Sequence, residues 1–164
     1  MKDFFDKLSS YNFFNYFFPG ILFCFISGKV SKYNFIQTDI LSGLFLYYFV
    51  GIIISRVGSI VIEPIFKNSK IIKFSDYTSY VVASKKDDRI VLFSEINNAY
   101  RSLISLIVCL FAIAGFSWIS NIIKLPNSLE FAFLGILLLV VLVLSYRKQS
   151  EYIKKRITAL TEKE

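Results

Sequence analysis

Four long apolar blocks constrain this sequence more than any other feature. An α-helix rises 1.5 Å per residue, so a block of about 18 or more apolar residues matches the hydrocarbon thickness of a bilayer. A chain of 164 residues cannot bury four helices that are apolar around their whole circumference in a soluble core. We therefore predict an all-α polytopic membrane protein with four transmembrane helices. The expected spans are residues 11–28, 40–63, 102–123 and 129–146.

The polar segments between and around these blocks complete a single membrane domain over residues 1–164. The leader, residues 2–10, has the pattern of a short interfacial helix. In the central loop, residues 64–101, Asp76 reads as a helix start, and residues 94–101 are expected to run as helix into the third span. Residues 124–128 predict a tight turn, so that the last two spans form an antiparallel hairpin. The tail, residues 147–164, should continue the fourth helix.

Lysine and arginine are distributed unevenly between the two sides of this layout. The leader carries two, the central loop seven and the tail six, whereas the opposite side has only Lys29, Lys32 and Lys124. Because cytoplasmic segments of membrane proteins are enriched in Lys and Arg, both termini and the central loop are expected in the cytoplasm.

Catalytic and cofactor-binding chemistry finds little support in the sequence. The chain has no histidine, which removes imidazole metal ligands and the common histidine-dependent nucleophile arrangements. It also lacks a glycine-rich phosphate loop and a cysteine cluster, and the central loop is too small for an independent enzymatic domain. We expect neither an enzyme nor a cofactor.

Arg56 is the most informative single residue, because an arginine within a span is costly unless it is paired, hydrated or able to reach the headgroups. One interpretation ends the second span near Ser55, with Arg56 extending to inner-leaflet phosphates. The other places Arg56 in the interior or at an oligomer axis, with Glu63 of a neighbouring helix as its partner. In this sequence Glu63 lies seven residues on, on the same helix face, and precedes Pro64, where the helix is expected to end.

Small and polar residues in the first two spans are candidates for helix contacts. Gly51, Ser55 and Ser59 form a stripe at four-residue spacing, which would let another helix approach closely. If this face is left open in the monomer, it would serve a homo-oligomer. Asn12 and Asn15 could hydrogen-bond another helix, and Pro19 should kink the first span or begin it afresh.

The basic residues of the loop and tail form a candidate surface for partners. Anionic lipid is the default ligand for such residues beside a membrane, while an acidic protein, a nucleic acid or a signalling nucleotide would use the same side chains. The residues concerned are Lys67, Lys70, Lys73, Lys85, Lys86, Arg89, Lys154, Lys155 and Arg156.

Three short stretches carry a resemblance to a known group of proteins. They run from Tyr11 to Gly20, from Ile54 to Ser59 and from Ser145 to Gln149. With the four-span layout, they resemble the small accessory membrane proteins of bacterial antiviral loci, above all the type VI-B CRISPR accessory family also associated with RADAR-type systems. The membrane subunit of Kiwa is similar in span count.

The resemblance implies a homo-oligomeric inner-membrane effector or accessory of antiphage defence. Such a protein would alter membrane permeability or modulate a cytoplasmic nuclease, deaminase or other defence protein. A non-conducting scaffold or chaperone for another membrane protein is the alternative. A small transporter is a weaker one, because the spans offer only Arg56 and Glu63 as ionisable groups for a pathway.

The orientation generates a first prediction. A membrane-impermeant thiol reagent added to intact cells should label a Ser31→Cys variant, because residue 31 is expected outside. A Ser84→Cys variant should stay unlabelled until the membrane is opened. Labelling of Ser84→Cys in intact cells would reverse the predicted topology.

Overall fold

The computed structural model describes residues 10–161, and all of their regular secondary structure is helical, with no strand in this range. Four helical runs, Phe13–Val30, Ile40–Asn68, Arg89–Ile123 and Asn127–Thr161, are long and apolar enough to cross a membrane. The predicted fold class is confirmed, and the chain is a multi-pass membrane protein. The leader helix expected at residues 2–10 lies outside the described residues, except for Ser10. In order, the elements are α2 (Ser10–Asn12), η1 (Phe13–Phe17), α3 (Phe18–Val30), α4 (Ile40–Val57), η2 (Gly58–Ile62), α5 (Glu63–Asn68), α6 (Tyr77–Ser84), α7 (Arg89–Ile123) and α8 (Asn127–Thr161).

Local signals in the sequence set several of these boundaries. The Asp76 carboxylate accepts a hydrogen bond of 2.9 Å from the Ser79 amide at the start of α6, and the hydrogen bonds from Ser79 lower the pKa of Asp76. At the other end of the molecule, Lys124 adopts a left-handed conformation (φ 52°) that ends α7, and Pro126 directly precedes α8. The predicted helix start and tight turn are confirmed. α7 begins earlier than expected, at Arg89.

Each of the first two apolar runs contains a π-helical segment just before a proline. η1 precedes Phe18-Pro19, and η2 precedes Glu63-Pro64. A proline inside a helical run lacks the N–H that would donate to the preceding turn, and its ring crowds the carbonyl four residues earlier; at both prolines the preceding turn is π-helical. The first helical run passes through Pro19 without a non-helical residue, because Phe17 and Phe18 both have right-handed helical backbone angles, so the predicted fresh start at Pro19 is wrong. The expected helix end at Glu63 is wrong, since α5 continues through Pro64 to Asn68.

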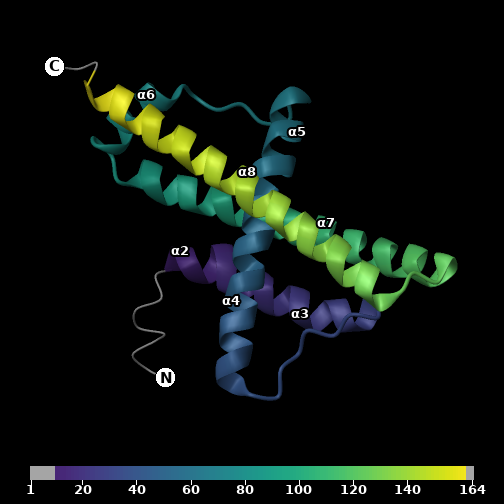
Figure 1. Cartoon of the computed structure of the whole chain (residues 1–164). Coiled ribbons are helices and arrows are strands. Elements are labelled where there is room, and N and C mark those ends of the chain that lie inside the picture. The colour runs from purple at the N-terminus through teal and green to yellow at the C-terminus, as the bar shows by residue number, and fades with distance from the viewer. Residues whose placement is uncertain (1–9, 162–164) are drawn as a thin grey trace.

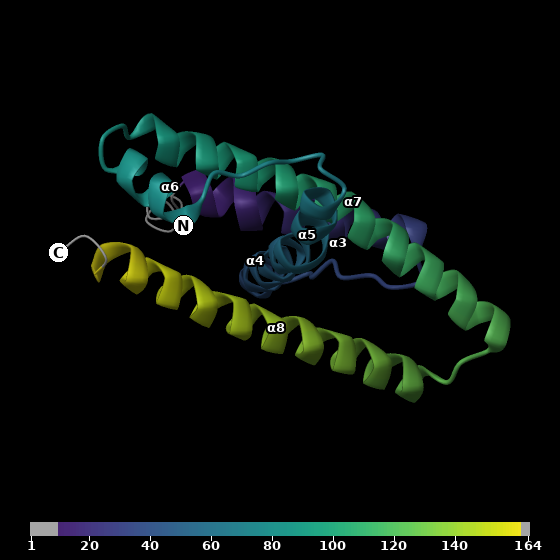
Figure 2. The ribbon, with the colours of Figure 1, turned by 90° about the horizontal axis from the view of Figure 1, so that it is seen from above.

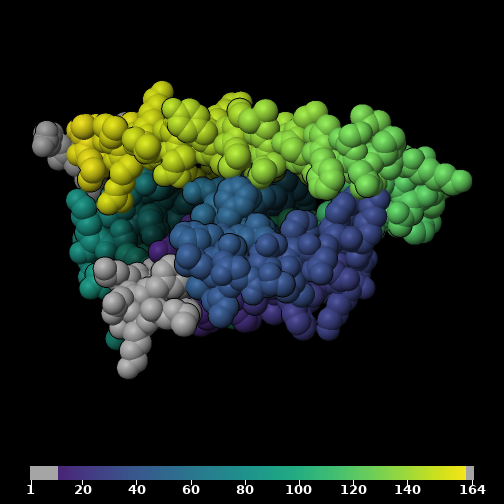
Figure 3. Space-filling view, turned by 60° about the horizontal axis from the view of Figure 1, so that its bottom comes forward, coloured from purple at the N-terminus to yellow at the C-terminus, as the bar shows by residue number. Residues whose placement is uncertain are grey.

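The position of α4 separates the two longest helices. α7 and α8 run antiparallel and meet near their connecting turn, where the Phe116 and Phe133 rings stack at 5.1 Å between centroids. Away from the turn they diverge, and α4 crosses steeply between them (Figures 1 and 2). α8 packs on α4, η2 and α6 and extends along one whole edge of the molecule (Figure 3). The predicted antiparallel hairpin of α7 and α8 is therefore present, but α4 lies between its two helices away from the turn.

The core lies where α3, α4 and α7 pack together, around Phe23, Cys24, Ile54 and Leu106. Its closest contact is a reciprocal crossing of two glycines. A Cβ on Gly20 would lie 1.8 Å from the Tyr47 carbonyl oxygen, and a Cβ on Gly51 would lie 1.7 Å from the Tyr16 carbonyl oxygen. Because both obstacles are backbone atoms, the two helices can approach this closely only with glycine at both positions.

The crossing generates a second prediction. Gly20→Ala and Gly51→Ala should each lower the thermal transition in detergent by about 5 °C or more, because the two backbones must separate. Gly115→Ala is the matched control, since a Cβ there meets nothing within 4 Å. Fluorescence-detected size-exclusion chromatography after heating measures all three. Equal transitions in the three variants would contradict the crossing.

Candidate functional site

A charged cluster lies where α5, α7 and α8 meet, and we call it the Glu63 cluster. The Glu63 side chain is buried, with 6% of the residue exposed. Its Oε2 accepts a hydrogen bond of 2.9 Å from Arg101 Nη1, and its Oε1 accepts one of 2.9 Å from Lys67 Nζ. Lys148 Nζ lies 3.5 Å from the same Oε1. One carboxylate thus joins cations from three helices.

The proline after Glu63 explains how Lys148 is held. In the π-helical pattern an N–H donates to the carbonyl five residues earlier, as the Glu63 N–H does to Gly58. The same pattern would pair residue 64 with the Ser59 carbonyl, but Pro64 has no N–H. Lys148 Nζ donates to the Ser59 carbonyl instead. The cation from α8 therefore satisfies a backbone acceptor and a buried carboxylate together.

The structure does not place Arg56 on Glu63. Arg56 is half-buried, and within residues 10–161 it forms no ion pair or side-chain hydrogen bond. Arg56 directly follows Ser55, whose Oγ accepts a hydrogen bond of 3.1 Å from Ser102 of α7. The proposed Arg56–Glu63 pair is thus not supported, because Glu63 already has its partners in Arg101, Lys67 and Lys148.

The small-residue stripe is used inside the chain. Gly51 faces the first helical run, and Ser102 Oγ donates to Ser55 Oγ at 3.1 Å. Ser59 is buried as well. The premise that this face is left open for a second copy is wrong, because the chain's own helices cover it.

The polar residues of the first helical run lie inside the same packing. Asn12 ends α2, and Pro19 is buried. Asn15 is 1% exposed; its Nδ2 donates within its own helix to the Tyr11 carbonyl at 3.0 Å, and its Oδ1 has no partner. Asn15 therefore forms no interhelical hydrogen bond within residues 10–161, although the sequence allowed one.

A second ion pair, at the end with the α7–α8 turn, was missed by the sequence reasoning. Glu130 is 3% exposed and is paired with Lys32. It also accepts hydrogen bonds from Ser120 and, at 2.8 Å, from the Tyr33 hydroxyl. Burial and the bond to Glu130 raise the pKa of Tyr33 to about 12, so this donor stays protonated at physiological pH. The sequence did contain a signal for this pair: Glu130 is an acid at the start of the fourth apolar block, on the side that carries Lys29, Lys32 and Lys124.

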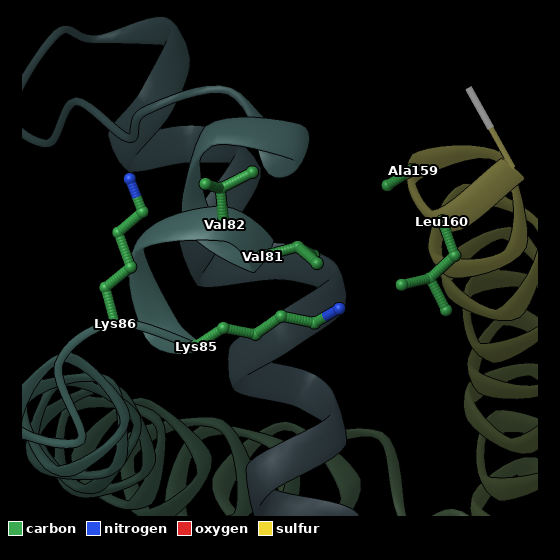
Figure 4. Close-up of a pocket in the computed structure, with 6 residues that line it drawn as sticks. All are labelled: Val81, Val82, Lys85, Lys86, Ala159 and Leu160. Carbon is green, nitrogen blue, oxygen red and sulfur yellow. The ribbon is translucent and has the colours of Figure 1, made fainter. Parts of the chain in front are cut away.

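Part of the predicted basic surface surrounds a groove between α6 and the end of α8. An open groove of about 570 Å³ is lined by Lys154, Lys155, Asp76 and Glu151 among others. Beside it lies a smaller pocket of about 190 Å³, lined by Lys85 and Lys86 together with four apolar residues. In Figure 4, Val81 and Lys85 extend from α6 toward Ala159 and Leu160 of α8, while Lys86 points away.

The other predicted basic residues are not brought to this groove. Lys67 belongs to the Glu63 cluster. The remaining four are exposed outside the groove and pocket; they are Lys70, Lys73, Arg89 and Arg156.

Comparisons with known proteins add no family to this picture. No protein-family model, no curated protein and no solved structure matches the chain. Within residues 10–161, no group of three or more His, Cys, Asp or Glu side chains is placed to hold a metal ion.

The Glu63 cluster generates a third prediction. Glu63→Gln should destabilise the protein, because three cations then face one another without a carboxylate. In a double-mutant cycle with Arg101→Gln, the two changes should show a coupling of about 0.5–2 kcal/mol in SDS-induced unfolding from mixed micelles.

The matched control for this cycle is the Arg147–Glu151 pair of α8, which is exposed and four residues apart. Exposed pairs of this kind contribute little, so its coupling should be smaller. A Glu63–Arg101 coupling no larger than that of the control would show that the cluster does not hold the helices together.

Proposed function

We propose that this chain is a non-enzymatic accessory protein of a bacterial antiphage defence system, which forms a homo-oligomer in the inner membrane and modulates a cytoplasmic defence protein. The observation that carries the proposal is the groove between α6 and α8. Lys154 and Lys155 line the groove together with the carboxylates Asp76 and Glu151, and Lys85 extends into the adjoining pocket, so lysines outnumber carboxylates along this surface. An acidic segment of a partner protein is the ligand that this charge and shape favour. The antiviral setting comes from the resemblance described above.

The distribution of polar residues favours partner binding over a change in permeability. Among the described residues the two buried carboxylates are Glu63, which accepts from Arg101, and Glu130, which accepts from Ser120, so they flank Leu106 of the core along α7. The core itself is lined by residues such as Phe23, Ile54 and Leu106, and the exposed middle of α8 is also apolar. Conducting and transporting proteins place polar or ionisable groups along their pathway. Within residues 10–161 the polar side chains buried between Glu63 and Glu130 are uncharged, and Ser102 and Ser105 use their hydroxyl groups in helix contacts, with Ser55 and with the Ile54 carbonyl.

The homo-oligomer in this proposal needs a surface other than the small-residue stripe. α7 and α8 supply one, because large apolar side chains stand exposed along both, including Phe111, Trp118 and Phe131. The alternative function, a scaffold that captures another membrane protein on the stripe, loses its main support, since Gly51, Ser55 and Ser59 are covered within the chain.

The location of the groove agrees with a cytoplasmic partner. The start of α2 and the end of α8 lie on the same side of the molecule as α6, away from the α7–α8 turn (Figure 1). This is also the end that carries most of the basic residues, which favours the cytoplasmic side for it.

The proposal generates a fourth prediction. In a strain that carries the whole defence locus, Lys154→Glu combined with Lys155→Glu should reduce protection from phage by at least about tenfold in plating efficiency, because like charges would repel the acidic partner. The matched control is Lys70→Glu combined with Lys73→Glu, which makes the same charge change outside the groove. The control should protect as wild type does.

Membrane potential measured in the same infected cells separates the two mechanisms. Wild-type cells should keep their potential at the time when protection is established. Full protection by the groove variant, together with depolarisation that requires the chain, would replace partner binding by a permeability mechanism.

A further inference from the structure

The Glu63 cluster carries more positive charge than its carboxylate balances. Lys67, Arg101 and Lys148 lie within 4 Å of Glu63, and in the described chain none of them pairs with another acid. Lys148 is repelled by both Arg101 and Lys67. Arg56 is a fourth cation on the adjoining turn of α4, because Ser55, which precedes it, accepts a hydrogen bond of 3.1 Å from Ser102, which follows Arg101. Such an excess is unfavourable in a partly buried site unless an anion compensates it.

The two arginines of this region also have unused hydrogen-bond donors. A guanidinium carries five N–H donors, yet Arg101 uses only Nη1 in a side-chain hydrogen bond. Its Nε is buried without an acceptor. Arg56 forms no side-chain hydrogen bond within residues 10–161. The N–H donors that these two planar guanidinium groups leave unused, beside the Lys148 ammonium group, match the tetrahedral oxygens of a phosphate group.

The depth of the cluster in the molecule is that of lipid headgroups. Arg101 directly precedes the apolar residues 102–123 of α7, and Lys148 follows the apolar residues 129–146 of α8. These segments are roughly 33 and 27 Å long at 1.5 Å per residue, about one hydrocarbon thickness. Basic pockets between helices at this level are where anionic headgroups bind.

We propose that Arg56, Arg101 and Lys148 form a binding site for a phosphate group at the boundary of the membrane. Glu63 is a positioning residue that holds Arg101 and Lys148 from α7 and α8 beside Arg56 of α4. The Tyr152 ring lies beside the same site, with its centroid 5.6 Å from Lys148 Nζ. The phosphate belongs either to an anionic phospholipid or to a soluble ion, and the site does not depend on the groove between α6 and α8.

Native mass spectrometry of the delipidated full chain in neutral detergent tests this site. Phosphatidylglycerol is titrated at constant ionic strength, with phosphatidylcholine as the lipid whose headgroup carries no net charge, and the titration is repeated with inorganic phosphate as competitor. Arg56→Gln should weaken binding of one phosphatidylglycerol by about tenfold or more, because a charged two-point contact is lost. Arg56 has no ion pair to break, so the melting temperature without lipid should be unchanged.

Two further variants keep the test sharp. Arg89→Gln removes an exposed arginine from the same end of α7 and should bind the lipid as wild type does. Arg56→Lys keeps the charge without the planar fork and should fall between wild type and Arg56→Gln.

The outcomes separate the two sources of phosphate and the failure of the proposal. Binding that depends on Arg56 and resists inorganic phosphate assigns the site to a lipid headgroup. Binding that depends on Arg56 and is competed away by inorganic phosphate assigns it to a soluble phosphate. Equal binding by Arg56→Gln and Arg89→Gln, or no preference for phosphatidylglycerol over phosphatidylcholine, overturns the proposal.

Discussion

The buried Glu63 carboxylate ties together helices that would otherwise meet only through apolar contacts. In a bilayer, apolar side chains gain little from packing on one another rather than on lipid, so close backbone contact and polar interactions must select the arrangement. The Gly20–Gly51 crossing supplies the close backbone contact, and Glu63 supplies the polar interaction. Pro64 leaves the Ser59 carbonyl without a backbone donor. The ammonium group of Lys148 donates to this carbonyl and also pairs with the Glu63 carboxylate, which holds α8 beside η2.

Features that depend on neighbouring residues were predictable from the sequence. The four apolar runs, the cap at Asp76 and the turn at Lys124 follow from hydropathy and local backbone chemistry, and the structure contains each of them. The π-helical segments were not predicted, because nothing in the local pattern around Pro19 or Pro64 distinguishes a π-helical approach from a kink or a helix end.

Features that depend on distant residues were predicted poorly. Glu63 was matched with Arg56 because they share one helix face, whereas its partners outside its own helix, Arg101 and Lys148, lie far along the chain. Arg101 and Lys148 both stand at the boundary of an apolar block. Comparing the depth of charged residues in the membrane, rather than their spacing along one helix, would have indicated them as partners of Glu63. The stripe of Gly51, Ser55 and Ser59 was recognised as a packing surface, but sequence alone does not tell whether the chain covers that surface itself.

The attachment of α8 at separate points has a mechanical consequence. α8 is one unbroken helix of 35 residues, bound through Glu130 near its start, through Lys148 in its second half and through Ala159, buried against α6, near its end. From Lys148, Glu130 lies roughly 27 Å away along the axis and Ala159 roughly 17 Å in the other direction. A rigid helix held in this way can pivot about the contact between Lys148 and Glu63. A tilt that displaces the Glu130 end would swing the Ala159 end the opposite way by roughly three-fifths as far, which would open or narrow the groove against α6.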